Sequence, residues 1–259
     1  MMRIAILQMT AVPGDVAANL EQIETAAAQA AAGGADLLIA PELATTGYGA
    51  GDVIADLAEA AEGPQVRQLT ALSEKHRLAL VAGFAERDGE QLFNSLVMVD
   101  GGTAPGFYRK THLYGDYERA LFTPGDMDSA LRSFHGLKLG FLICYDVEFP
   151  ENVRRLARAG ADAVLVPTAL PQGPFAGFIA ATVVPVRAFE NQVFVVYANH
   201  GGDDDNFSYA GLSRAIGPDG RCLAASDTDE AALLFADIEP DAFDESRRAN
   251  TYLADLRET

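Results

Sequence analysis

The sequence predicts an α/β fold with a mixed sheet, on three observations. Short apolar runs typical of buried strands alternate with amphipathic segments along the chain. Strand pairs joined by turn residues interrupt this alternation, so antiparallel strands should accompany the parallel ones. A composition of 49% hydrophobic and 22% charged residues over 259 residues is that of a globular chain with a large core, which excludes a mostly disordered protein.

The first half of the chain is expected to form strands separated by two helices. The first helix begins after Asp15, whose side chain suits a helix N-cap, and ends at Gly33 and Gly34. A second helix is predicted at 64–77. Strands are predicted at 3–9, 36–40, 78–85, 93–100 and 106–110, with an Asp88-Gly89 turn between the third and fourth.

The second half continues the alternation and then closes with short strands. Strands at 137–144, 163–167 and 193–199 should alternate with helices at 148–160 and 175–190. The segments 209–216, 222–225 and 231–238 are predicted to form a closing antiparallel set. We therefore expect one domain over 1–238, with a polar tail at 239–259 that lies outside the core and is a candidate subunit interface.

Charge and composition restrict the partners. Nineteen Lys and Arg face 37 Asp and Glu, giving a net charge of -18, which repels phosphate backbones and anionic membranes. No apolar run approaches the length of a membrane-spanning helix, and the N-terminus lacks a signal-peptide pattern, so a cytoplasmic protein is expected. The two cysteines give no disulfide framework, and no Cys or His pair has zinc spacing.

Three reactive side chains fall where strands are expected to end. Glu42 lies in PELATTGY, Lys110 in GFYRKTHLYG and Cys144 in FLICYDVEFPENVR. A thiol between a strand and a helix is close to backbone N–H groups and the positive end of a helix dipole, which favours a thiolate. Cys144 could act as a nucleophile, with Glu42 as the base and Lys110 as a charge that stabilises an oxyanion.

Each residue taken alone also has a structural explanation. A cysteine at the end of an apolar strand is often a small buried hydrophobe, a glutamate after proline is often a helix cap, and a lysine beside an arginine is often solvated. Cys222 has no acid or base nearby in the sequence and is interpreted as structural. The basic trio Arg154, Arg155 and Arg158 is interpreted as a solvated or interface face.

Together these segments resemble the nitrilase superfamily of carbon–nitrogen hydrolases, whose members use a Glu-Lys-Cys triad. The three motifs occur in the family's order and with family-like spacing. The segment DYERALFTPGD places Glu118 where many members carry a second glutamate, and VPVRAFENQVFVVYANHGG is similar to the family's late helix and strand. The resemblance covers the chain from ILQMT to about Ile238.

The resemblance implies a fold, an assembly and a set of roles. The fold is a four-layer α-β-β-α sandwich, which would dimerise into an eight-layer unit, with no metal or organic cofactor. Cys144 would be the nucleophile and Glu42 the general base and later acid. Lys110 would stabilise the tetrahedral intermediate with the backbone N–H of Tyr145, and Glu118 would orient Lys110 or the substrate amine.

The motif around the nucleophile favours one branch of the family. CYDVEFPENVRRLA resembles small aliphatic amidases of the 5-aminopentanamidase and R-stereoselective types, whereas typical nitrilases carry Cys-Trp-Glu in place of Cys144-Tyr145-Asp146. The leading hypothesis is an amidase that releases ammonia from a small aliphatic amide through a thioester. A nitrilase or N-carbamoyl hydrolase on the same site remains open, as does a non-catalytic dimeric interaction protein, although the retained triad argues against the latter.

A Cys-His mechanism would need a histidine base instead of Glu42. We expect none of the four histidines to be an essential base, and we expect His112, two residues from Lys110, to help position that lysine; the four are His76, His112, His135 and His200.

Overall fold

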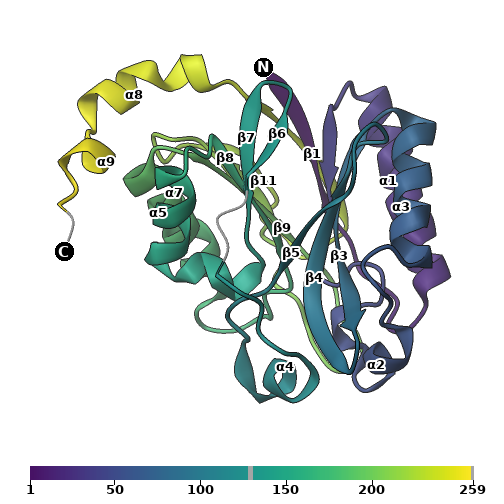
Figure 1. Cartoon of the computed structure of the whole chain (residues 1–259). Coiled ribbons are helices and arrows are strands. Elements are labelled where there is room, and N and C mark those ends of the chain that lie inside the picture. Colours follow the sequence, from purple (N-terminus) through teal and green to yellow (C-terminus); the bar gives the residue numbers. More distant parts are fainter. Residues whose placement is uncertain (128–130, 258–259) are drawn as a thin grey trace.

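The computed structural model describes residues 1–127 and 131–257, in which two mixed sheets pack face to face between two layers of helices (Figure 1). The predicted α-β-β-α sandwich is therefore confirmed. The first sheet has the strand order β12-β1-β2-β3-β4-β5, formed by β1 (Met2–Gln8), β2 (Leu37–Ile39), β3 (Ala79–Asp88), β4 (Gln91–Val99), β5 (Gly106–Arg109) and β12 (Ala232–Ile238). The second has the order β11-β10-β9-β8-β7-β6, formed by β6 (Arg132–Phe134), β7 (Leu137–Phe141), β8 (Ala163–Thr168), β9 (Phe194–Asn199), β10 (Arg214–Ile216) and β11 (Cys222–Ala225).

Both sheets have the same pairing pattern. Strands β1, β2 and β3 are mutually parallel in the first sheet, as are β7, β8 and β9 in the second, and the outer strands pair antiparallel to them. Parallel strands bring their carboxyl ends to one edge of a sheet, where the following loops can converge. Two such edges therefore supply loops to one end of the molecule.

Side-chain alternation in the central strands builds two cores at once. In β1, Ile4 and Ile6 belong to the core between the sheets, while Ala5 and Leu7 belong to the core under the first helical layer. Successive residues of a strand point to opposite faces, so a strand buried on both sides is apolar throughout. This explains why the apolar runs of the sequence are continuous rather than alternating.

The helical layers begin and end where the local sequence dictates. Helices α1 (Val16–Ala32) and α3 (Pro64–His76) cover the first sheet, and α5 (Pro150–Arg158) and α7 (Val184–Asn191) cover the second (Figure 1). The predicted N-cap is confirmed, since Asp15 Oδ1 accepts a hydrogen bond of 3.0 Å from the Ala18 N–H. Three short elements near one end of the sandwich were not predicted: η1 (Tyr48–Ala50), α2 (Val53–Leu57) and α4 (Gly115–Leu121).

The predicted strand 137–144 and helix 148–160 are wrong at the junction that carries the cysteine. Strand β7 ends at Phe141, a 3₁₀ segment η2 (Cys144–Glu148) follows, and α5 begins only at Pro150. A residue that precedes proline is disfavoured in the helical region, and Phe149 is extended, with φ -86° and ψ 111°. Proline is favoured at the first helical position, so α5 starts there.

The predicted helix 175–190 is also interrupted. It consists of α6 (Ala176–Phe178), a π-helical turn η3 (Ile179–Val183) and α7. A π-helical turn places one additional residue in a helix and redirects the side chains on either side of it.

The predicted closing set of three antiparallel strands is wrong. Strands β10 and β11 pair with each other in the second sheet, but β12 crosses to the first sheet and pairs with β1, Met2 opposite Ile238. In the segment 209–216 only β10 is a strand. Strand β12 therefore joins the two halves of the sandwich at its edge.

The chain after β12 forms η4 (Pro240–Phe243), α8 (Asp244–Ala249) and α9 (Tyr252–Asp255), drawn in yellow at the edge of Figure 1. Phe243 differs from the expectation for the tail, because its ring is buried against Phe194, with centroids 5.1 Å apart. The division into 1–238 and 239–259 stays a prediction, and 258–259 lie outside the described residues. Within the described residues, no helix is long and apolar enough to cross a membrane.

Candidate active site

Glu42 is held in the loop after β2 by a close approach of two backbones. The loop lies directly against β3 at Gly83, where a Cβ atom would stand 2.2 Å from the Leu43 nitrogen. Gly83 donates to the Pro41 carbonyl at 3.0 Å and accepts from the Thr45 N–H at 3.2 Å. Only a residue without a side chain allows this contact, so Gly83 sets the position of the Glu42 backbone.

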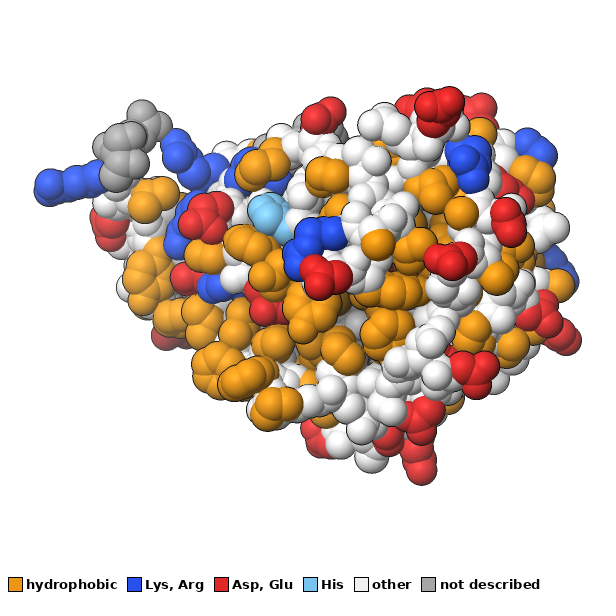
Figure 2. Space-filling model, turned by 90° about the horizontal axis from the view of Figure 1, so that it is seen from below, with side chains coloured by type: hydrophobic (Ala, Val, Ile, Leu, Met, Phe, Trp, Pro, Cys, Tyr) orange, Lys and Arg blue, Asp and Glu red, His pale blue; other side chains and the backbone are white. Residues whose placement is uncertain are grey.

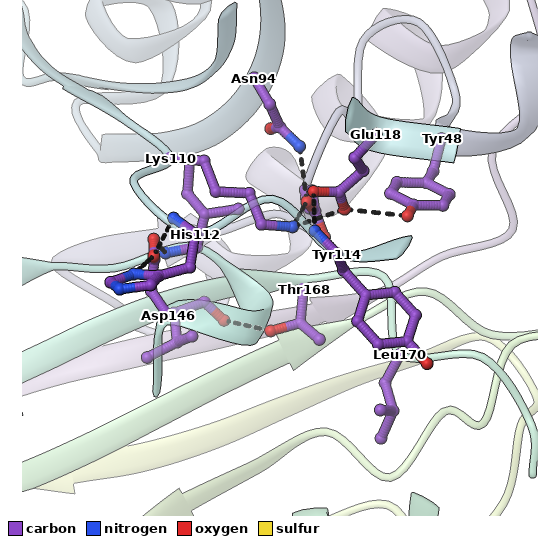
Figure 3. A network of polar contacts seen from close by, with 12 residues as sticks. Tyr48, Asn94, Lys110, His112, Tyr114, Glu118, Asp146, Thr168 and Leu170 are labelled. Carbon is purple, nitrogen blue, oxygen red and sulfur yellow. Dashed lines mark hydrogen bonds and ion pairs between the residues drawn. The ribbon is translucent and has the colours of Figure 1, made fainter. Parts of the chain in front are cut away.

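Lys110 follows β5 and turns its whole side chain into the protein (Figure 3). Its backbone N–H continues the sheet pairing by donating to the Asn94 carbonyl at 2.8 Å. Its ammonium lies 2.7 Å from Glu42 Oε1 and 2.6 Å from Glu118 Oε1. The lysine is therefore not solvated, and it joins two carboxylates that are distant in the sequence.

Glu118 projects from α4, and both oxygens of its carboxylate accept hydrogen bonds from neighbouring residues. Its Oε1 also accepts from the Tyr48 hydroxyl at 2.9 Å, and its Oε2 accepts from the Tyr114 N–H at 2.8 Å (Figure 3). The structure thus brings together Glu42, Lys110 and Glu118, three of the residues that the sequence singled out. Charged groups of this kind tolerate burial only when they are paired and hydrogen-bonded, as here.

The two oxygens of Glu42 differ in their contacts. Oε1 accepts from Lys110 and from the Asn94 side-chain amide at 2.6 Å. Oε2 is buried and has no hydrogen-bond partner among the described residues. Burial raises the pKa of Glu42 to about 7, with the Lys110 charge opposing this shift and the Glu118 charge adding to it. The carboxylate is thus able to accept and return a proton near neutral pH.

Lys110 remains charged in this environment. Burial alone would lower its pKa, but the negative charges of Glu42 and Glu118 outweigh that effect and raise it. An ammonium has three N–H donors, and two of them point to the two glutamates. One donor is thus left for a group that enters the site.

Cys144 begins η2 in an unusual backbone conformation, with φ 46°, and its side chain is buried. Burial raises the pKa of the thiol well above its usual value, and the nearby Glu42 charge raises it further, while Lys110 acts in the opposite direction. The expectation that the helix dipole would favour a thiolate is wrong, because α5 starts only at Pro150 and does not begin at the cysteine. This shift favours the protonated thiol, so attack by the sulfur calls for a base.

Asp146, two residues after the cysteine, ties η2 to the segment that follows Lys110. Its carboxylate accepts hydrogen bonds from two side-chain hydroxyls and two backbone N–H groups: Tyr108 Oη at 2.9 Å, Thr111 Oγ1 at 2.8 Å, His112 N at 2.8 Å and Ile143 N at 3.2 Å. Both η2 and the loop after β5 are thereby fixed to the same carboxylate. Sequence reasoning used Asp146 only as a family marker and missed this role.

His112 belongs to the contacts around Asp146 rather than to those of the Lys110 ammonium. Its Nδ1 lies 2.9 Å from Asp146 Oδ1, and its ring stacks on Phe149 with centroids 4.0 Å apart. His200 contacts the backbone of Glu42: its side-chain Nε2 donates to the Glu42 carbonyl at 2.7 Å. Burial lowers the pKa of His200.

A pocket of about 540 Å³ opens onto the cysteine. It is lined by Cys144, Tyr145 and Glu148 on the η2 side and, on the other side, mainly by apolar residues of the segment 170–183: Leu170, Pro171, Pro174, Phe175, Ala176, Phe178, Ile179 and Val183. Tyr114 lies at its edge and points toward Leu170 (Figure 3). Figure 2 shows the molecule from below. This face carries a broad group of hydrophobic side chains with acidic ones around it.

Cys222 does not line this pocket, and its thiol is exposed. Across 1–127 and 131–257, no three His, Cys, Asp or Glu side chains are grouped in a way that could hold a metal ion.

Two mixed sheets between helical layers, with a cysteine and a buried Glu-Lys-Glu cluster at one end, define a hydrolase of the nitrilase superfamily. The chain matches the carbon–nitrogen hydrolase family over residues 3–248 and belongs to that family. The chain is thus a hydrolase that acts on carbon–nitrogen bonds.

Relatives of the chain include several amidases. It is 37% identical to an (R)-stereoselective amidase from a Pseudomonas species over 99% of this chain and 92% of that protein. It is 34% identical to a nitrilase from Pyrococcus abyssi over 92% of this chain and 90% of that protein. Its structure matches the NitN amidase from Nesterenkonia sp. AN1 with a TM-score of 0.89 at 37% identity, over 99% of this chain and 97% of that one.

Proposed function

We propose that this protein is a cysteine-dependent amidase that hydrolyses small aliphatic carboxamides to a carboxylic acid and ammonia. The proposal rests on the buried Oε2 of Glu42, which has no hydrogen-bond partner among the described residues and is held beside Lys110, together with the pocket that Cys144 lines. One variant of the Nesterenkonia amidase was solved with acrylamide added to its active-site cysteine and another in complex with butyramide, which supports a nucleophilic cysteine and an amide-binding pocket.

In the first half of the reaction, Glu42 Oε2 takes the proton from the Cys144 thiol as sulfur attacks the amide carbon. The carbonyl electron pair moves to oxygen and forms a tetrahedral oxyanion. Glu42 then gives its proton to the amide nitrogen, the C–N bond breaks and ammonia leaves. The pKa of Glu42, about 7, suits both the removal and the return of the proton.

In the second half, a water molecule gives a proton to Glu42 and its oxygen attacks the thioester carbon. The C–S bond breaks, sulfur takes the proton back, and a carboxylic acid is released. The same carboxylate therefore acts as base and then as acid in each half. The balance is one amide and one water consumed for one acid and one ammonia produced.

The oxyanion is stabilised in both halves by groups that stay fixed. The remaining N–H of the Lys110 ammonium and the backbone N–H of Tyr145 are the proposed donors. Glu118 keeps the ammonium in place through its own contacts with Tyr48 and Tyr114. In this proposal Glu118 is a positioning residue for Lys110.

Ammonia release from matched amides, nitriles and ureido acids tests the proposal. Amides of about three to six carbons should give kcat/KM at least ~10-fold above the corresponding nitriles, a difference of about 1.4 kcal/mol in transition-state binding. Equal or faster turnover of nitriles would favour a nitrilase, and turnover of ureido acids alone would favour a carbamoyl hydrolase. A protein that releases no ammonia from any of them would contradict the enzymatic proposal. The homodimer and the cytoplasmic location expected from the sequence remain predictions.

A further inference from the structure

His200 follows β9 and joins the second sheet to the loop that carries Glu42. Its side chain is buried, and its Nε2 lies 2.7 Å from the Glu42 carbonyl oxygen. A carbonyl oxygen can only accept, so Nε2 carries the proton in this contact. Burial lowers the pKa of His200, which favours a neutral ring with a single N–H. Nδ1, 3.3 Å from the Met9 carbonyl, then has no proton to give, and the one donor of the ring belongs to Glu42.

The peptide that links Glu42 to Leu43 depends on contacts from outside the loop. Leu43 has a φ of 47°, in the left-handed region that a leucine rarely adopts. Such a conformation persists only when the surrounding structure holds it. Gly83 binds the loop on either side of this peptide, and His200 binds the Glu42 carbonyl between those two contacts. The direction in which the Glu42 side chain leaves the backbone is therefore set partly by the His200 ring.

The second sheet also holds the sulfur of Cys144. The backbone N–H of Ala169, directly after β8, donates to that sulfur. Strands β8 and β9 are parallel neighbours, and their pairing extends past the end of β9, where the His200 N–H donates to the Thr168 carbonyl at 3.3 Å. The Thr168 carbonyl and the Ala169 N–H belong to one peptide group. That group contacts the sulfur on one side and His200 on the other, so a short path of contacts joins the sulfur to the backbone of Glu42.

We propose that His200 is a positioning residue that holds the Glu42 carboxylate at the distance from the Cys144 sulfur that proton transfer requires. The inference rests on the proposed function, which makes Glu42 the base and Cys144 the nucleophile. Asp146 ties the cysteine segment to the loop of Lys110, and His200 adds the corresponding tie to Glu42. His200 does not line the pocket, so it acts through Glu42 and not on the substrate.

The test compares two amide replacements that differ only in their reach. In His200→Gln the side-chain nitrogen lies as many bonds from Cβ as Nε2 does, so an N–H still reaches the Glu42 carbonyl. In His200→Asn the nitrogen lies as many bonds from Cβ as Nδ1 and falls short. His200→Gln should keep kcat for butanamide within about 10-fold of the wild type. His200→Asn should lose about 10²-fold in kcat, the effect of displacing a reacting group by about 1 Å, with KM within about 3-fold.

Alkylation of Cys144 by iodoacetamide, measured by peptide mapping, gives a readout that needs no turnover. The thiolate is the reacting form here as well, so Cys144 should react about 10-fold more slowly in His200→Asn than in His200→Gln. Thermal melts of both variants identify a purely structural role, in which the losses would follow the melting temperature and not the reach of the amide. If the shorter asparagine prevents folding, His200→Met fills the space without an N–H and should show the same loss.

Tyr209→Phe is the control. Its ring centroid lies 5.2 Å from that of His200, and its hydroxyl contacts Asp204, so the variant disturbs the same region and should keep the wild-type kcat. Equal kcat values in His200→Gln and the variant without a donor in reach, or equal alkylation rates in the two, would overturn the inference. If the wild-type protein releases no ammonia from any amide, the amidase proposal fails, while the alkylation rates still decide whether His200 places Glu42 against the sulfur.

Discussion

The buried polar cluster around Lys110 and the outer wall of the pocket, formed by 170–183, are built in different ways. In the cluster, Glu42 and Lys110 are both 0% exposed and are held by several hydrogen bonds each, whereas on the outer wall Phe175 and Phe178 are 70% and 59% exposed. The cluster residues come from separate strand ends and loops of the first sheet, and the outer ones from one continuous segment that includes a π-helical turn. The groups proposed for chemistry are therefore rigid, while the groups that face the substrate chain have few restraints.

The difference indicates which changes the protein can accept. Removing a group from the buried cluster leaves buried charges or donors without partners, which affects both the reaction and the fold. Changing an exposed ring of the outer wall removes only part of a surface and alters which substrates fit. Four predictions, from the largest expected effect to the smallest, test this separation.

Cys144→Ala should abolish turnover, with a loss of at least ~10⁴-fold in kcat, because the variant lacks the sulfur that attacks the amide carbon. The fold should persist, since alanine has nearly the same backbone preferences as cysteine at a φ of 46°. Ammonia release and a thermal melt of the purified variant measure the two effects. Cys222→Ala is the control, because that exposed thiol lies outside the pocket, and it should retain the full rate. Iodoacetamide inactivation that follows labelling of Cys222 instead would contradict the assignment.

Asp146→Ala should lower the free energy of unfolding by about 3 kcal/mol, because two hydroxyls and two backbone N–H groups lose their acceptor. The rate should also fall, since η2 and the loop after Lys110 are no longer fixed to one group. Urea unfolding and kcat measure the two effects. Asp162→Ala is the matched control. Its carboxylate accepts from the Lys138 backbone and does not line the pocket, so the cost should be about 1 kcal/mol with an unchanged rate. Equal effects in the two variants would show that Asp146 has no special role.

The pH dependence should report Glu42. The base must be deprotonated to accept the thiol proton, so kcat/KM should fall as the pH drops below about 7. The hydrogen bond from Asn94 lowers the pKa of Glu42. Asn94→Ala should therefore raise that pKa and move the acid-side fall of kcat/KM to higher pH. Ser95→Ala is the control, since the Ser95 hydroxyl contacts Glu86 instead. It should leave the pH at which kcat/KM falls unchanged. An Asn94→Ala profile identical to that of the wild type would argue against Glu42 as the titrating group.

Phe178→Ala should have the smallest effect. Its ring is 59% exposed, so the free energy of unfolding should change by no more than about 0.5 kcal/mol. The change should appear mainly as a higher KM for longer amides, within about 10-fold, with kcat nearly constant. Steady-state kinetics on short and long amides provide the measurement. A loss of ~10²-fold or more in kcat on acetamide would show that the outer wall takes part in the chemistry.

The elements predicted best are those with strong local signals. Helix α1 follows from apolar spacing and the Asp15 cap, and β1 and β8 follow from apolar runs of the right length. Separated motifs in the sequence are sufficient to select Glu42, Lys110, Glu118 and Cys144. Local signals failed where pairing is non-local: the sequence of β12 does not distinguish a partner in the second sheet from β1, more than 200 residues away.

The sequence by itself determined the layered α/β class and most of the regular elements, and it selected the side chains that are proposed to react, because periodicity and short motifs are local properties of the chain. Only the tertiary structure decided how these side chains are paired and charged. The protonation of Cys144 and Glu42 depends on burial, and the partners of Glu42 and Lys110 come from Asn94 and Glu118 on other elements. Burial and pairing arise from contacts between distant segments, so no local pattern encodes them.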